Sequence, residues 1–94
     1  MQQEQLHAKV MGRVQGVGFR FFVIETAQQL GLTGWVRNRW DESVEVLAEG
    51  EHDKLEQLLV ALRRGPSLAH VTQVQHEWGE ASGAYNRFQA LPTE

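Results

Sequence analysis

The sequence contains no cysteine, and this absence removes several kinds of chemistry at once. Without cysteine there is no disulfide, no thiolate zinc site and no cysteine nucleophile. Apolar runs are also short, and none approaches the roughly 20 residues that a membrane-spanning helix needs. The first residues, MQQEQLHAK, lack the charged and then apolar order of a signal peptide. These absences predict a cytoplasmic protein with no membrane partner.

The chain has 94 residues, of which 41% are hydrophobic and 22% charged, and this is the composition of an ordinary folded protein. Such a length is enough to bury one two-layer core and too short for a second domain. We therefore expect residues 1–94 to form a single domain.

The net charge of −3 is unevenly distributed along the chain. Residues 13–39 hold four of the basic side chains and a single acidic one. The basic ones are Arg13, Arg20, Arg37 and Arg39, and the acidic one is Glu25. A basic region within an acidic chain favours a small anionic ligand bound at one place and argues against nucleic acid as a partner. The alternative is that these arginines are scattered over a solvated surface.

Hydrophobic periodicity predicts strands of period 2 and helices of period 3.6. The expected strands span Leu6–Arg13, Thr33–Trp40, Val44–Glu49, His70–Trp78 and a short Arg87–Leu91, and the expected helices span Phe21–Leu30 and the leucines 55, 58, 59 and 62. Their order, βαββαβ with a possible short fifth strand, predicts an α+β ferredoxin-like sandwich, in which two helices cover one face of an antiparallel sheet. In this order the first and third strands are central, and the second lies beside the third.

The segment from Gly12 to Arg20, GRVQGVGFR, joins the first strand to the first helix. Gly16 and Gly18 allow positive φ or a close approach of backbone to a ligand, so that N–H groups and a helix N-terminus can converge on an anion. Arg20 adds a permanent charge with a planar fork of donors. The segment is neither a Walker loop, which needs Lys and then Ser or Thr, nor a dinucleotide fingerprint, because Phe21 replaces its third glycine. Plain turn chemistry is the alternative.

Asn38 is a second candidate, because alternation places it on the same face of its strand as Val36 and Trp40. A carboxamide there is either satisfied by backbone at a turn or edge, or free to hold a water molecule. The sequence does not decide whether Asn38 meets the glycine loop, since this depends on which strand ends adjoin.

Other polar and aromatic residues give weaker signals. The four histidines show no metal-ligand spacing, and Asp41 and Glu42 are adjacent in a turn and therefore point apart. Stacking on nucleic-acid bases is one possible role of the three tryptophans, but we expect these side chains to pack in the core or at an edge of the sheet. They are Trp35, Trp40 and Trp78.

Two segments, VMGRVQGVGFR at residues 10–20 and GWVRNRWDESVEVLAEG at residues 34–50, resemble the signature segments of the acylphosphatase family. The likeness extends in length and element order over nearly the whole chain. The second segment departs from the pattern at Glu42, where a glycine is usual. If the turn keeps the family geometry, Glu42 has positive φ at a cost on the order of 1 kcal/mol.

The resemblance implies a ferredoxin-like enzyme that hydrolyses acyl phosphates to a carboxylate and inorganic phosphate, with no metal and no cofactor. It implies that Arg20 binds the phosphate and that Asn38 orients the attacking water. The phosphate-binding segment implied in this way is Gln15, Gly16, Val17, Gly18, Phe19 and Arg20. The expected partner is a small acyl phosphate, and the protein is expected to be a monomer.

Two rival hypotheses stay open. The chain could be a non-enzymatic module of this fold that binds a small anion or a protein, related to the acylphosphatase-like domain of larger maturation factors. It could also be an RNA-binding domain of similar topology, which the acidic net charge disfavours.

Overall fold

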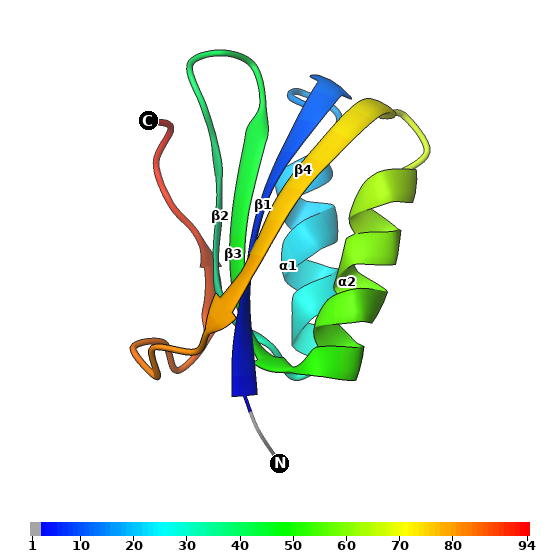
Figure 1. Cartoon of the computed structure of the whole chain (residues 1–94). Helices are drawn as coiled ribbons and strands as arrows, with labels where there is room; N and C mark the ends of the chain where they lie inside the picture. The colour runs from blue at the N-terminus through cyan, green and yellow to red at the C-terminus, as the bar shows by residue number, and fades with distance from the viewer. Residues whose placement is uncertain (1–2) are drawn as a thin grey trace.

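The computed structural model describes residues 3–94 and consists of two helices packed on one face of a five-stranded sheet (Figure 1). The elements, in chain order, are β1 (Gln3–Arg13), α1 (Phe19–Gln29), β2 (Thr33–Asn38), β3 (Val44–Glu51), α2 (His52–Arg64), β4 (His70–Glu80) and β5 (Phe88–Ala90). The sheet has the order β4-β1-β3-β2-β5. Its pairs are antiparallel except β2 with β5, which is parallel. The predicted ferredoxin-like fold, with β1 and β3 central, is confirmed.

The core lies between the sheet and the helices. On β1, the residues Leu6, Ala8 and Val10 are buried while the intervening residues are not, as their alternation predicts. The leucines predicted for the second helix are all buried on the inner face of α2. No helix of the described residues covers the opposite face of the sheet (Figure 1). Within residues 3–94, no helix is long and apolar enough to cross a membrane.

Helix α1 begins at Phe19, two residues before the predicted start. Gly18 has left-handed backbone angles (φ 79°, ψ 18°), which a glycine adopts without strain and which turn the chain directly into the helix. Phe19 is therefore a buried first residue, followed one and two turns later by Val23 and Ala27. The earlier start places Arg20 in the first helical turn, beside the loop it follows.

Strand β1 can pair closely with β4 near its end because residue 12 is glycine. Its φ is +124°, and a Cβ at this position would lie 2.2 Å from the carbonyl oxygen of His70. The register shifts between Met11 and Gly12, and this irregularity redirects the chain toward the loop.

The hairpin turn between β2 and β3 starts earlier than predicted, because β2 ends at Asn38 and Trp40 lies in the turn. The Arg39 N–H donates to the Ser43 carbonyl, and Asp41 accepts hydrogen bonds from the N–H and hydroxyl of Ser43. The expectation that Trp40 packs in the core or at an edge is wrong, since its side chain is 80% exposed. Glu42 lies between Asp41 and Ser43 and has a φ of 73°. The turn therefore has the left-handed geometry expected where the family pattern has a glycine.

Candidate active site

A surface hollow of about 400 Å³ lies where the loop after β1, the start of α1 and the end of β2 meet. Its lining residues are Val14, Gly16, Gly18, Phe19, Arg20, Phe21, Ile24, Asn38 and Ala90. Arg20 and Asn38 come from segments far apart in the sequence, and the fold brings them to the same hollow. The question that the sequence left open is thereby answered, since Asn38 does meet the glycine loop.

The backbone donors around the hollow are free. Among the hydrogen bonds of residues 3–94, none engages the N–H groups of residues 16–21 as donors. Gly16 and Gly18 both have positive φ, which makes the loop turn sharply before α1. The helix start has no side-chain cap and no acidic residue in its first turn. The positive end of the helix dipole is therefore left for a bound anion.

The two polar side chains of the hollow are also unengaged. The Arg20 side chain is exposed and forms no ion pair with the acids of residues 3–94. The carboxamide of Asn38 makes no hydrogen bond to the same residues, and no unsatisfied side-chain atom among them is buried, so the amide is reachable from solvent. The interpretation of Asn38 as a turn residue satisfied by backbone is therefore wrong for its side chain.

The main chain of Asn38, in contrast, is held firmly. Its carbonyl accepts a hydrogen bond of 3.1 Å from the N–H of Glu94, and the Glu94 carbonyl accepts one of 3.2 Å from the N–H of Trp40. Residues 91–94 thus continue along β2 beyond the short strand β5. This support went unpredicted because the polar, proline-containing end of the sequence shows no strand pattern.

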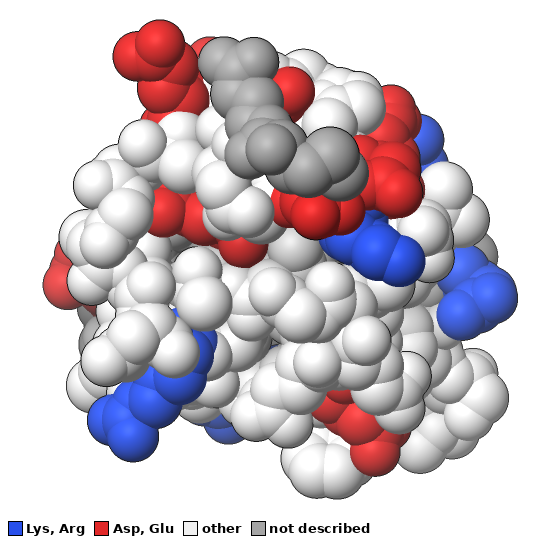
Figure 2. Space-filling model, turned by 90° about the horizontal axis from the view of Figure 1, so that it is seen from below, with Lys and Arg blue, Asp and Glu red and all other residues white. Residues whose placement is uncertain are grey.

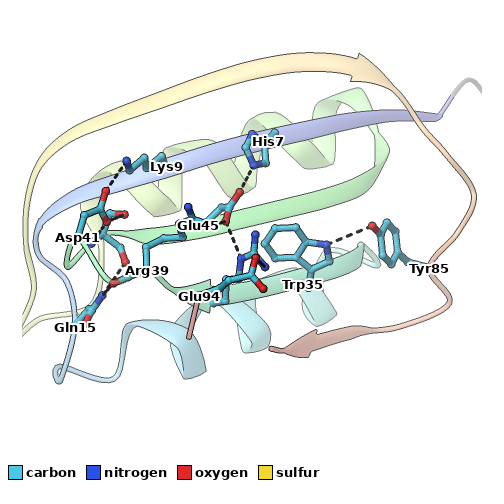
Figure 3. A network of polar contacts seen from close by, with 11 residues as sticks. His7, Lys9, Gln15, Trp35, Arg39, Asp41, Glu45, Tyr85 and Glu94 are labelled. Atoms are coloured by element: carbon cyan, nitrogen blue, oxygen red, sulfur yellow. Dashed lines mark hydrogen bonds and ion pairs between the residues drawn. The ribbon is translucent and has the colours of Figure 1, made fainter. Parts of the chain in front are cut away.

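Two members of the predicted phosphate-binding segment do not line the hollow. The side chain of Gln15 turns away and donates from Nε2 to the carbonyls of Arg39 and Ser43, each at 2.8 Å (Figure 3). The side chain of Val17 packs against the hydrophobic core. The Gln15 amide ties the loop to the β2–β3 turn, a role that the sequence did not suggest.

The basic region recognised in the sequence is divided between the two faces of the sheet. The carboxylate of Glu45 accepts hydrogen bonds from both Arg37 and Arg39. Figure 3 shows Glu45 and Arg39 on the open face of the sheet, opposite the helices. The guanidinium of Arg37 also lies 4.7 Å from the ring centre of Trp35. The prediction that these arginines share one anion site is therefore wrong for these two, and Arg20 is the arginine that lines the hollow.

Glu45 is the centre of this polar network. Burial acts to raise the pKa of its carboxyl, but the hydrogen bonds from His7 and Arg37 outweigh burial, and the pKa is lowered. The same carboxylate raises the pKa of Arg37. The network therefore fixes the outer face of β2, and with it the strand that presents Asn38 on the inner face.

Metal coordination has no candidate among the described residues. Within residues 3–94, no three side chains of His, Asp or Glu come together in the way that a metal ion requires.

The fold is that of a small α+β domain, and its hollow is lined by the glycine loop, Arg20 and Asn38. Residues 6–90 match the acylphosphatase family. A curated acylphosphatase of Salinibacter ruber is 45% identical over 86 residues, which cover 92% of this chain and 90% of that protein. The crystal structure of acylphosphatase from Bacillus subtilis superposes with a TM-score of 0.90 at 39% identity and covers 94% of this chain and 98% of its own. HypF of T. kodakarensis matches 92% of this chain with 11% of its own, at 31% identity and a TM-score of 0.79.

The chain therefore belongs to the acylphosphatase family, a family of enzymes that hydrolyse acyl phosphates. The resemblance found in the two sequence segments is confirmed.

Proposed function

We propose that this chain hydrolyses acyl phosphates in the hollow between the β1–α1 loop and Asn38, with no metal ion. The supporting observation is that an unpaired arginine, loop residues with free N–H groups and an accessible carboxamide line one hollow. In this proposal the segment Gln15–Arg20 supplies backbone donors, Arg20 binds the phosphate and Asn38 orients the water.

The phosphoryl group fits the donor set. Free N–H groups of the loop and of the first turn of α1 can each meet a phosphoryl oxygen, and the guanidinium of Arg20 can bind two. Negative charge spreads over these oxygens as the phosphoryl group is transferred. Donors that are already in place stabilise this charge without having to reorganise, which is the main source of rate enhancement in such sites.

The leaving group explains why few residues are enough. The bond that breaks joins phosphorus to the oxygen of a carboxylate, whose conjugate acid has a pKa of roughly 4. A carboxylate departs without being protonated, so no general acid is needed. The attacking water gives its proton to a phosphoryl oxygen, and Asn38 holds the water in line with the leaving oxygen.

The test is turnover of benzoyl phosphate by the purified protein in the presence of a metal chelator. We expect hydrolysis to persist with chelator and to fall by at least about a hundredfold in Arg20→Ala and in Asn38→Ala. Arg63→Ala and Asn86→Ala are matched controls, because both residues are exposed and neither lines the hollow. Full activity of Arg20→Ala would disprove the assignment of the site.

The rival of a non-enzymatic anion-binding module is separated by the same assay. The likeness to part of HypF is compatible with such a module. Tight binding of inorganic phosphate by well-folded protein, without turnover of any acyl phosphate, would favour it.

The setting of the enzyme is part of the proposal. Residues 1–94 would act as one monomeric domain in the cytoplasm, on a small acyl phosphate and not on nucleic acid. The acidic net charge of −3 supports the last point. Sedimentation and a titration with single-stranded RNA at low salt test the monomer and the absence of RNA binding.

A further inference from the structure

The hollow has an apolar wall in addition to its anion donors. Phe21 and Ile24 both line it, and they lie three residues apart on α1, so their side chains are neighbours on one face of the helix. Ala90 of β5 adds a small apolar side chain. One half of the hollow is therefore polar and suits a phosphate, and the other half is apolar and suits the acyl group attached to that phosphate.

Phe21 has little structural reason to be aromatic. Its side chain is 69% exposed, and it is not among the residues of the hydrophobic core or those packed against it. A single exposed apolar side chain is common on protein surfaces and by itself indicates nothing. Phe21 differs because it borders a concave site next to Arg20, the residue that would bind the phosphate.

The direction of the reaction points to the same wall. In an in-line displacement, the leaving oxygen lies on the side of the phosphorus opposite the attacking water. The water would be held by Asn38, which belongs to β2 in the sheet layer. Phe21 and Ile24 belong to α1 in the helix layer (Figure 1). On this axis the acyl group would leave on the side of α1, where Phe21 and Ile24 line the hollow.

We propose that Phe21 and Ile24 bind the acyl group and determine specificity, so that the preferred substrates are acyl phosphates with an apolar and, best, aromatic acyl group. This inference rests on the proposed function and names its substrate class. An aromatic acyl group can stack on Phe21 or meet it edge to face, whereas a small acyl group such as acetyl reaches neither side chain effectively.

The experiment compares benzoyl phosphate with acetyl phosphate as substrates. The measured quantity is the ratio of the two kcat/KM values. Each variant's ratio is divided by that of the starting protein, because this cancels the intrinsic reactivities of the two acyl phosphates. We expect Phe21→Ala to lower the ratio about fivefold and Ile24→Ala to lower it in the same direction. Phe21→Leu, which keeps an apolar side chain, should retain part of the preference.

The controls separate this inference from the proposed function. Val60→Ala alters an apolar side chain that is 61% exposed on α2 and does not line the hollow, so the ratio should stay unchanged. Inhibition by inorganic phosphate should also be unchanged in Phe21→Ala, because phosphate meets only the polar half. An unchanged ratio in both wall variants overturns the inference and leaves the hydrolase standing. If the starting protein hydrolyses neither acyl phosphate, both the inference and the proposed function are overturned.

Discussion

Glu42 occupies a backbone conformation in the β2–β3 turn that glycine adopts more easily. Its φ of 73° is in the left-handed region, which costs a residue with a Cβ about 1 kcal/mol or more. The turn keeps this conformation because Asp41 accepts two hydrogen bonds from Ser43 and because Arg39 and Ser43 close the hairpin. The strain is therefore borne by the backbone of one exposed residue and does not displace β2.

Glu42→Gly should raise the free energy of unfolding by about 1 kcal/mol, because glycine adopts the same φ without strain. Urea denaturation followed by circular dichroism measures the change. Glu42→Ala is the matched control: it removes the charge but keeps the Cβ, so it should change stability by less than about 0.5 kcal/mol. Equal stabilisation by both variants would show that the charge, and not the backbone, was unfavourable.

Gln15 links the two halves of the site. Its amide donates to two main-chain carbonyls of the β2–β3 turn, and no other hydrogen bond between the loop of residues 14–18 and this turn is found within residues 3–94. Because these hydrogen bonds hold the loop against the hairpin, we expect Gln15 to act as a positioning residue for Arg20 and Asn38.

Gln15→Met keeps the length of the side chain and removes both hydrogen bonds. We expect it to lower the free energy of unfolding by about 2 kcal/mol and to lower kcat about tenfold, because a small displacement of water relative to phosphate is costly. Gln15→Glu should be worse, since a carboxylate would face two carbonyl oxygens without a proton to donate. Denaturation curves and steady-state kinetics measure both effects. A fall in stability with unchanged kcat would reduce Gln15 to a structural role.

At the scale of elements, close contact between β1 and β4 fixes the direction in which the chain enters the phosphate loop. Gly12 permits this contact, because any Cβ there would overlap the His70 carbonyl at 2.2 Å. Gly12→Ala should therefore lower the free energy of unfolding by about 3 kcal/mol. Gly79→Ala is a suitable control on β4, because nothing lies within 4 Å of a Cβ at Gly79. Thermal unfolding of both variants tests this, and equal losses would contradict it.

The elements also show what the sequence can and cannot predict. Leu6, Ala8 and Val10 alternate, and the leucines of α2 recur at helical spacing, because burial on one face imposes these periods. Main-chain hydrogen bonds impose no such pattern, and for this reason the run of residues 91–94 along β2 went unpredicted. The start of α1 at Phe19 was missed for a similar reason, since a left-handed Gly18 can begin a helix without any capping side chain.

The site itself was predictable only in part. Gly16, Gly18, Arg20 and Asn38 were identified from the chemistry of their side chains or backbone, and the fold brings them to one hollow. Their proximity depends on which strand ends adjoin, and this is a property of the sheet topology and not of any local segment. The prediction that Arg37 belongs to the anion site was wrong, because side chains alternate along β2 and Arg37 therefore lies on the face opposite Asn38. The number of charges in a segment does not show on which face each charge lies.

For the whole molecule, one group of acidic residues lies away from the site. The register pairs Gln3 with Glu51 and Glu4 with Glu80, so these acids gather where β1 begins, and the phosphate loop follows the other end of β1. Figure 2 shows acidic side chains gathered on part of this lower surface. These acids are thus a strand length away from the phosphate loop, which weakens their repulsion of an anionic substrate.

The open face of the sheet holds two carboxylates that should govern stability in acid. Glu45 accepts hydrogen bonds from His7 and Arg37, and Glu49 accepts them from Gln5 and from Ser82. Burial acts to raise the pKa of each carboxyl, but these donors prevail, and both pKa values lie below the ordinary 4.5. Both groups therefore contribute stability that is fully present above pH 4.5 and is lost as the pH falls through the folded pKa.

The free energy of unfolding should accordingly fall as the pH drops below 4.5, with a slope of up to about 1.4 kcal/mol per pH unit for each of the two carboxylates. Glu45→Gln and Glu49→Gln should each reduce this slope, since the substituted amide does not titrate and the unfolded chain loses one proton-binding group. Urea denaturation at a series of pH values from about 3 to 7 measures it. Glu25→Gln is the control, because Glu25 is exposed on α1 and forms no ion pair within residues 3–94. If Glu25→Gln flattens the curve as much as Glu45→Gln does, acid instability comes from general charge and not from the open-face network.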